Sequence, residues 1–274
     1  MPRFQRIYWS EKFDWKEYSR LYDRYAKSSG NFYVQSASAL IGSAPLKRDA
    51  KAIDLACGTG VLTSLLVEKY PKMGILGVDL SKEMLALYRR NFTGQIKTSQ
   101  VKAMQGNAEK IGRMTKEKHD AVFINCALWD LEIEKTFSGI AKVLNKGGLL
   151  AFNLPSLVLG REKGFVSFIE SFFRQELNST AVYRRISMDY AKRALEKYGF
   201  WIESMKEYEL RLSRQNIGLF FELLRYRWPF VFFPRGMQYE KKLELCKRIF
   251  DECYKHVPAG GMKDYGFSFV LRKK

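Results

Sequence analysis

The sequence is poor in the residues and patterns that mark a metal site, a disulfide scaffold or a membrane span. It has two histidines, and its four cysteines lack both the spacing of a zinc site and the setting of a disulfide framework. Cys246 and Cys253 lie seven residues apart in an expected helix, so we expect them to be packed thiols. No apolar run approaches the roughly 18 residues that a membrane span needs. These absences predict no metal site and favour a reducing cytoplasm.

Charge of one sign is plentiful, but it is not gathered in blocks. Lysine and arginine number 47 against 29 acidic residues, a net charge of +18, with no run of five or six basic residues. Such a charge favours an anionic partner, either nucleic acid or an anionic membrane surface that the protein would contact peripherally. The alternative is a solvated basic surface without a specific partner. The first residues, 1–4, lead into a charged, aromatic segment rather than a signal peptide, which again favours the cytoplasm.

One stretch, Ala52–Thr63, organises the chain. An apolar run of strand type reaches Ala56, the turn Cys57-Gly58-Thr59-Gly60 follows, and apolar residues then recur at helical spacing up to Tyr70. The glycines can adopt positive φ and let a ligand approach the backbone. The free N–H groups at the start of the following helix face the turn. Strand, glycine turn and helix form the first half of a βαβ unit.

The residues around this turn indicate which ligand it holds. A dinucleotide fingerprint needs a third glycine, but Thr63 stands at that position. Asp54 lies just before the turn, where a carboxylate suits an ammonium group better than a pyrophosphate. About twenty residues on, the apolar strand 76–79 ends in Asp79, where a carboxylate binds ribose hydroxyls. An adenosine joined to a cationic amino acid is S-adenosylmethionine (SAM).

Three motifs in the right order resemble those of the class I SAM-dependent methyltransferases. Residues 54–60 resemble motif I, 78–85 the next, and 105–109 the third, with Asn107 where the family usually has Asp. The resemblance spans about 54 to 155 and implies SAM as cofactor and S-adenosylhomocysteine (SAH) as product. A different Rossmann-like ligand is the alternative. The cofactor-binding residues that it implies are Asp54, Ala56, Gly58, Gly60, Asp79, Leu80, Met84, Asn107, Ala108, Asn125, Tyr22 and Tyr33.

The two tyrosines in this set come from expected N-terminal helices. Related methyltransferases carry Tyr-Asp in the first helix, here Tyr22-Asp23, and the ring closes over the methionine end of SAM. Tyr18, Leu21, Tyr22 and Tyr25 also form one amphipathic stripe, so a purely buried role is the alternative.

Alternating strands and helices predict an α/β fold with a doubly wound, Rossmann-like sheet. The expected strands are 52–56, 74–78, 101–104, 121–124, 149–154, 200–208 and 265–271, and the family's last strand is antiparallel. The expected helices begin at about 13 and at 32, 61, 82, 132, 164 and 188. We divide the chain into an N-terminal helical arm or lid (1–45, irregular over 1–12), a SAM-binding domain (46–210), an inserted helical and aromatic cap (211–263) and a final strand (264–274).

No catalytic motif stands out. His119 begins a strand at the edge opposite the ligand, whereas His256, near the end of the cap, is a weak candidate for a general base. Trp129 either borders the methyl group or lies in the core, and Tyr22 is a third candidate. The segment 125–130 lacks the paired prolines of methylases that act on nucleic-acid bases. Methyl transfer mainly needs alignment and exclusion of water, so the missing motif does not argue against an enzyme.

The cap indicates the acceptor. Aromatic residues at 219–221 and 228–234 alternate with Arg225, Arg227 and Arg235, a composition that suits a hydrophobic or an anionic substrate. The alternative is that Phe220, Phe221, Phe230 and Phe232 fill the cap's own core. Three hypotheses follow: a methyltransferase that acts on O, N or C of a small hydrophobic or aromatic metabolite, an RNA methyltransferase, and a non-catalytic SAM-binding regulatory protein.

Overall fold

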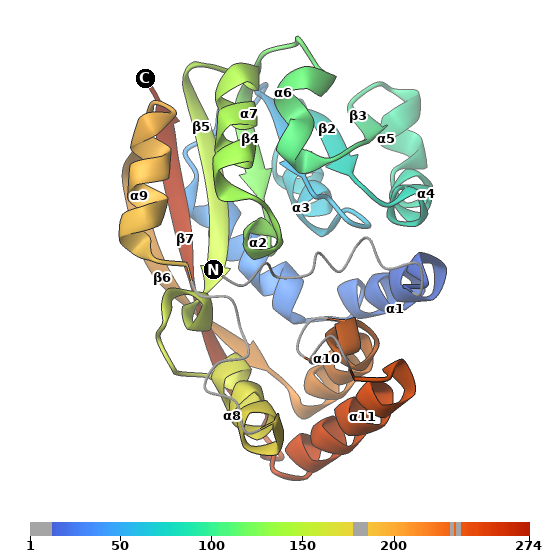
Figure 1. The fold of residues 1–274 in the computed structure, drawn as a ribbon. Helices are drawn as coiled ribbons and strands as arrows, with labels where there is room; N and C mark the ends of the chain where they lie inside the picture. The colour runs from blue at the N-terminus through green and yellow to red at the C-terminus, as the bar shows by residue number, and fades with distance from the viewer. Residues whose placement is uncertain (1–12, 178–185, 231–232, 234–236) are drawn as a thin grey trace.

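A seven-stranded sheet lies at the centre of the computed structural model, which describes residues 13–177, 186–230, 233 and 237–274 (Figure 1). The strand order is β3-β2-β1-β4-β5-β7-β6. The neighbouring strands from β3 to β5 run parallel, and β7 runs antiparallel to both β5 and β6. The predicted doubly wound sheet with an antiparallel last strand is therefore confirmed. The irregular arm expected over 1–12 lies outside the described residues.

The strands lie close to their predicted positions. They are β1 (Lys51–Leu55), β2 (Gly74–Asp79), β3 (Val101–Gln105), β4 (His119–Ile124), β5 (Leu144–Pro155), β6 (Phe200–Leu212) and β7 (Met262–Lys273). The last two are longer than predicted because they pair as one hairpin along almost their whole length, from Phe200 opposite Lys273 to Leu212 opposite Met262. The segment inserted between them is therefore 213–261.

The helices include all those that the periodicity predicts. They are α1 (Trp15–Ala26), α2 (Phe32–Ser43), α3 (Val61–Lys69), α4 (Lys82–Asn91), α5 (Thr93–Lys97), α6 (Ile111–Met114), α7 (Ile133–Val143), α8 (Phe165–Leu177), α9 (Met188–Lys197), α10 (Arg214–Arg227) and α11 (Tyr239–Lys255), with 3₁₀ turns η2 (Ala108–Lys110), η3 (Leu128–Asp130), η4 (Ser156–Leu159) and η5 (Trp228–Phe230). The predicted cap of α4 forms: Ser81 Oγ accepts from the N–H of Met84 at 3.1 Å.

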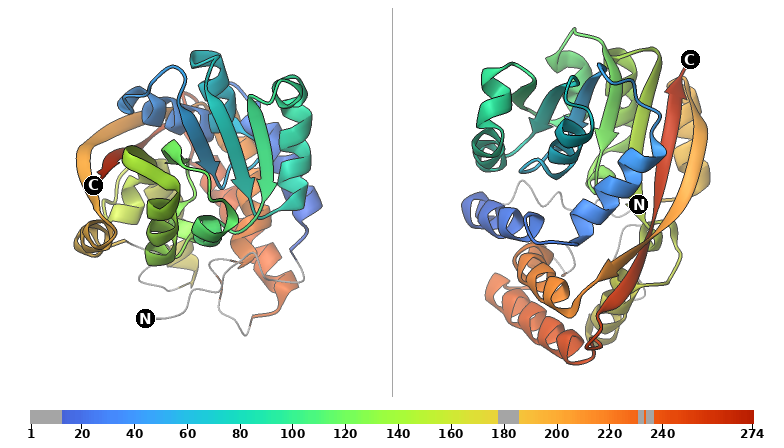
Figure 2. Two further views of the ribbon diagram at one scale, coloured as in Figure 1. Left: turned by 90° about the horizontal axis from the view of Figure 1, so that it is seen from above. Right: turned by 180° about the vertical axis from the view of Figure 1, so that it is seen from behind.

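Helices cover both faces of the sheet (Figure 2). Alternate residues of β1 point to opposite faces, as the period of a strand requires: Ala52 packs with α2 and α3, and Ile53 packs with α7. A second cluster with α7 and α9 therefore forms on one face, and α2, α3 and α4 cover the other.

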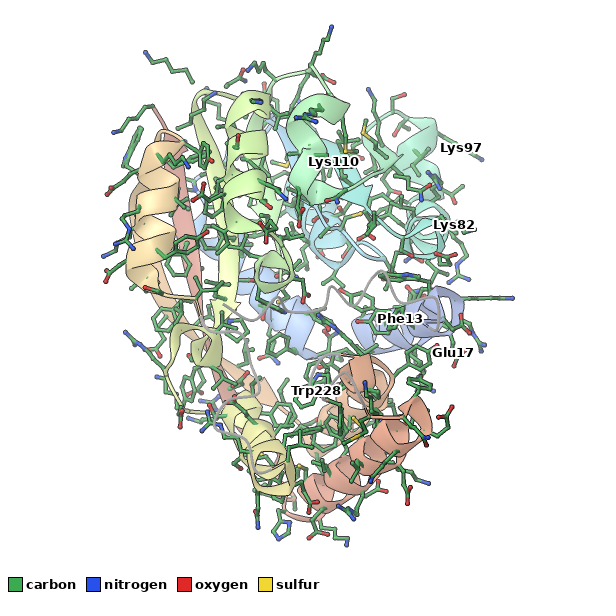
Figure 3. The ribbon with its side chains drawn as sticks, viewed as in Figure 1. Phe13, Glu17, Lys82, Lys97, Lys110 and Trp228 are labelled. Carbon is green, nitrogen blue, oxygen red and sulfur yellow. The ribbon has the colours of Figure 1, made fainter. Side chains whose placement is uncertain are left out.

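The helices of the insertion form an aromatic core of their own with α8. Phe250 of α11 has its ring centroid 4.9 Å from Phe221, 5.1 Å from Trp228 and 5.3 Å from Phe173. Trp228 is labelled between these helices in Figure 3. We call α8, α10, η5 and α11 the cap helices. This packing matches the sequence-based alternative in which Phe221 fills the cap's core, while Phe232 and the side chain of Phe230 lie outside the described residues.

The cap helices also contact the N-terminal helices. Phe220 stacks on Tyr25 of α1 at 5.0 Å and on Phe32 of α2 at 5.5 Å. The insertion and the N-terminal helices therefore share one apolar contact beside the carboxyl edge of the sheet (Figure 1).

The basic residues and the thiols complete the description. Lys82, Lys97 and Lys110 are exposed on three separate elements (Figure 3). Cys246 and Cys253 are buried free thiols, as predicted, and Cys57 is buried as well.

Across the described ranges, no helix combines the length and the apolar character that crossing a membrane requires.

Candidate active site

A pocket opens at the carboxyl edge of the parallel strands, where ligands of open α/β sheets bind. Its non-protein space is about 940 Å³ when the open volume at its mouth is included. Its lining residues are Trp15, Tyr18, Tyr22, Tyr33, Ala56, Gly58, Val78, Asp79, Leu80, Met84, Gly106, Asn107, Ala108, Glu109, Asn125, Cys126, Ala127, Asp130, Leu131 and Arg227.

The glycine turn brings backbone directly to the pocket wall. Ala56 has φ 62° and Gly58 has φ 55°, so the chain turns sharply between β1 and α3. A Cβ at position 58 would lie 3.3 Å from the ring of Tyr22, which covers the turn. Glycine adopts this conformation without strain and leaves room for the ring of Tyr22.

Asp79 is held against the turn by backbone hydrogen bonds. Its Oδ2 accepts from the N–H of Gly58 at 2.8 Å, and its Oδ1 accepts from the N–H of Ser81 at 2.9 Å. Burial raises the pKa of Asp79, while these donors favour the charged form and counteract the shift. Each carboxylate oxygen can accept more than one hydrogen bond, so Asp79 can still receive hydroxyl donors from the pocket.

Asp54 and Gly60, two of the predicted cofactor contacts, do not line the pocket. Asp54 is 1% exposed, and its Oδ2 accepts from Thr63 Oγ1 at 2.7 Å. The direct contact with an ammonium group that we expected of Asp54 is therefore absent from this geometry, because the side chain points toward α3. Gly60 has φ 100° and packs against Phe92, whose ring would lie 2.2 Å from an added Cβ. Both residues shape the turn from behind.

Tyrosines from the N-terminal helices cover the glycine turn. The rings of Tyr22 and Tyr33 lie 4.9 Å apart, and those of Tyr18 and Tyr22 lie 6.3 Å apart. Burial raises the pKa of each of these phenols above its ordinary value, so they stay protonated at neutral pH. They provide an aromatic wall and hydroxyl groups rather than a base.

An acidic side chain fastens α1 over the turn. Asp23 is 6% exposed and accepts from Lys27 Nζ at 2.6 Å, Arg90 Nη2 at 3.1 Å and Asn91 Nδ2 at 3.2 Å. Asn91 also donates to the carbonyl of Thr59 inside the glycine turn, at 3.0 Å. Asp23 thus joins α1 to α4, and Asn91 extends this connection to the glycine turn.

The end of β4 is held by a buried amide. Asn153 Nδ2 donates to Asn125 Oδ1 at 2.7 Å, and the N–H of Cys126 donates to Asn153 Oδ1 at 2.7 Å. Asn125 Nδ2 donates to the carbonyl of Tyr33 at 3.3 Å. Cys126 has φ 54°, a left-handed conformation that these contacts stabilise. Burial raises the pKa of its thiol to about 12, so it is not a thiolate.

The cap helices contribute one charged residue to the wall. Arg227, at the end of α10, pairs through Nη2 with Asp130 Oδ2 of η3, and the two side chains are 15% and 16% exposed. Tyr18 contacts Arg227, which lowers the pKa of the phenol against the larger effect of burial. The ion pair joins the cap helices to the sheet at the pocket.

The three weak catalytic candidates have different locations. Tyr22 lines the pocket, whereas Trp129 does not and packs against the α7 face, as in the alternative core role. His256 is exposed at the end of α11, where Nδ1 lies 3.0 Å from the carbonyl of Glu252 and the ring contacts Phe172. It is remote from the pocket lining, so we no longer propose it as a base. His119 is buried at the opposite edge of the sheet, as expected.

Sequence reasoning missed half of the pocket lining. The residues not predicted are Trp15, Tyr18, Val78, Gly106, Glu109, Cys126, Ala127, Asp130, Leu131 and Arg227. Gly106 and Glu109 belong to the third motif, and Tyr18 belongs to the predicted stripe, so local signals existed for them. For Arg227 the only signal in the sequence was the alternation of aromatic residues and arginines in the cap.

The residues present fit SAM. Asp79 offers carboxylate oxygens, Gly58 brings backbone to the pocket wall, and Glu109 and Asp130 add negative charge suited to a cationic ligand. Across the described ranges, no group of three or more His, Cys, Asp or Glu side chains is arranged to hold a metal ion.

Comparisons with known proteins define the class of the fold. A solved mycolic acid cyclopropane synthase in complex with SAH is 16% identical, with a TM-score of 0.60 over 94% of this chain and 94% of that chain. A structure described as a putative sarcosine dimethylglycine methyltransferase from Galdieria sulphuraria is also 16% identical, with a TM-score of 0.59 over 94% of this chain and 98% of that chain. These similarities show a Rossmann-like fold of the class I methyltransferase type.

Sequence comparisons indicate the same class of domain over part of the chain. Residues 52–148 match the family model described as a methyltransferase domain. Trans-aconitate 2-methyltransferase from Methylobacterium nodulans is 35% identical over 123 residues, which cover 44% of this chain and 45% of that protein. Malonyl-[acyl-carrier protein] O-methyltransferase from Priestia megaterium is 27% identical over 137 residues, 50% of this chain and 47% of that protein. These matches support a class I SAM-dependent methyltransferase domain over residues 52–148, and the chain matches about half the length of these curated relatives.

Proposed function

We propose that this protein transfers the methyl group of SAM to a small molecule with an apolar or aromatic body. The observation that carries the proposal is the composition of the pocket wall. It combines the glycine turn and Asp79 with the aromatic rings of Trp15, Tyr18, Tyr22 and Tyr33. The relatives named above act on small acids or a carrier-bound acid, as their names state.

The lining residues have separate roles in this proposal. Asp79 would accept hydroxyl groups of the cofactor's ribose, while Asn107 and Ala108 would border its base. Tyr22, Tyr33 and Asn125 would border the methyl-bearing end. When bound, the cofactor supplies a methyl group that is already activated on a sulfonium. The chain aligns the acceptor with that methyl group and excludes water.

Proton removal from the acceptor falls to a carboxylate. Among the described lining residues, Asp79, Glu109 and Asp130 are the acidic groups, and no histidine is included. Asp130 is next to the aromatic wall and is the base that we propose where the acceptor must lose a proton.

The first test is isothermal titration of the protein with SAM and SAH. We expect Asp79→Ala to weaken binding by about 2 kcal/mol, or about 30-fold, because a charged hydrogen-bond acceptor is lost. Lys82→Ala is the control, because Lys82 is exposed at the start of the neighbouring helix and does not line the pocket. An unchanged dissociation constant in Asp79→Ala would show that the ribose assignment is wrong.

The activity itself is tested by transfer of labelled methyl groups from SAM to a panel of small acids, phenols and amines. Transfer to any of them supports the proposal. SAM binding without transfer to any acceptor would favour the non-catalytic alternative. The comparisons give no support to the nucleic-acid or membrane contacts that the charge suggested, so we do not propose an RNA substrate.

A further inference from the structure

We propose that Arg227 binds an anionic group of the methyl acceptor, so that the acceptor is a small acid with an apolar or aromatic body. This inference rests on the proposed function and specifies the class of its substrate. The shared chemistry is a carboxylate or a phosphate, since a guanidinium offers two parallel N–H donors to either.

The location of Arg227 is the first argument. It is the one basic side chain among the described residues that line the pocket, and it comes from a different part of the chain from the cofactor end. The rings of Trp15 and Tyr18 line the same pocket, so an acceptor held by Arg227 can place an apolar body against them. Its charge is permanent, because the guanidinium does not lose its proton in the physiological range.

The ion pair with Asp130 is the second argument. Both side chains are largely buried, and removing two charges from water has a cost that the pair's attraction barely offsets. Apolar residues would join the cap helices to the sheet equally well. An arginine that a carboxylate orients in a pocket wall can instead bind an incoming anion, either in place of that carboxylate or together with it.

A neighbouring arginine shows the contrast. Arg225 lies two residues earlier on α10, pairs with Asp251 of α11 outside the pocket, and is more exposed, at 32%. The overall charge of +18 favours the approach of anions to the molecule. Arg227 is the basic residue placed where such an anion would meet the aromatic wall.

The test compares an acid with its neutral analogue in calorimetric titrations of the SAH-saturated protein. The probes are trans-cinnamate and trans-cinnamamide, which share one apolar body, and phenyl phosphate, which separates phosphate from carboxylate recognition. We expect at least one acid to bind at least 10-fold more tightly than the amide. Arg227→Gln should remove that preference while leaving amide and SAH binding unchanged, and Arg225→Gln should keep it.

A second variant distinguishes substrate recognition from a structural clamp. Asp130→Asn removes the carboxylate that competes for Arg227, so we expect the affinity for the preferred acid to rise severalfold. A fall in acid affinity in Asp130→Asn, equal to that in Arg227→Gln, would identify the pair as a clamp and overturn the inference. Equal binding of acid and amide to the wild-type protein, or no binding of either, would overturn it as well.

The order of the titrations keeps the two proposals apart. If the wild-type protein does not bind SAH, the proposed function fails. If it binds SAH but shows no acid preference that depends on Arg227, only the substrate class fails. Unchanged SAH affinity in Arg227→Gln also shows that this variant is folded.

Discussion

At the residue scale, Asp79 serves two functions with one carboxylate. Its Oδ2 accepts from the N–H of Gly58 and therefore fixes the turn, while the side chain also lines the pocket. The loss of binding free energy in Asp79→Ala thus has two sources: the missing contact with the ligand and the loosening of the turn. Asp54 contributes to the same turn from behind through Thr63.

Gly58 provides a separate test of the turn. An alanine there would hold a left-handed conformation, at roughly 1–2 kcal/mol, and its Cβ would press on the ring of Tyr22. We expect Gly58→Ala to weaken SAH binding about 10-fold in calorimetric titration, and Gly58→Val to abolish it. Gly74→Ala is the control, because nothing lies within 4 Å of its added Cβ. Wild-type affinity in Gly58→Val would contradict the close approach of ligand to backbone.

At the element scale, the position of α1 decides whether the pocket is covered. Asp23 joins α1 to α4 and, through Asn91, to the glycine turn, while Tyr25 and Phe220 join it to the cap helices. Helix α1 is therefore attached on two sides, one polar and one apolar. Weakening the polar side should loosen the tyrosine wall without disturbing the sheet.

Asp23→Ala tests that attachment. It removes hydrogen bonds from three side chains, so we expect SAH binding to weaken about 10-fold, since a charged hydrogen bond contributes about 1.5–3 kcal/mol. Glu17→Gln on the same helix is the matched control, because its pair with Arg20 is exposed. Limited proteolysis should cut Asp23→Ala faster within residues 13–31. If both variants behave like the wild type, α1 is held by its apolar contacts alone.

At the scale of the whole molecule, the sequence predicts the sheet and one end of the pocket but not the other. Strand and helix periods are local. The rule that ligands lie at the carboxyl ends of strands predicts Asp54, Asp79, Asn107 and Asn125 at the pocket, and all but Asp54 line it. Arg227 meets Asp130 across 97 residues of sequence, through packing of the cap helices that no local pattern encodes. The same packing leaves His256 exposed at the end of α11, outside the pocket lining.

Two buried carboxylates make the stability of the whole chain depend on pH. Burial raises the pKa of Asp54 and of Asp264 to about 7, from 3.8, although hydrogen bonds lower each in part. Asp264 lies on β7 beside the start of α8, is 1% exposed, and its Oδ2 has no hydrogen-bond partner among the described residues. Because the unfolded chain ionises first, the stability present below pH 4 is lost as the pH rises toward 7.

Asp264→Asn isolates one of these groups. The amide can still accept from the N–H of Val166, as Asp264 Oδ1 does at 3.3 Å, but it does not titrate. We expect urea unfolding at pH 5 and pH 8 to show a smaller loss of stability in the variant than in the wild type. A shift of about three pKa units corresponds to roughly 4 kcal/mol over the full range, most of it between pH 4 and 7. The comparison uses the change in the free energy of unfolding between the two pH values. The absolute values are not compared, because the substitution also changes the group at Oδ2, which has no hydrogen-bond partner among the described residues. If the two proteins lose stability in parallel, Asp264 is already ionised in the folded state at pH 5. It then caps the start of α8 as a charged carboxylate.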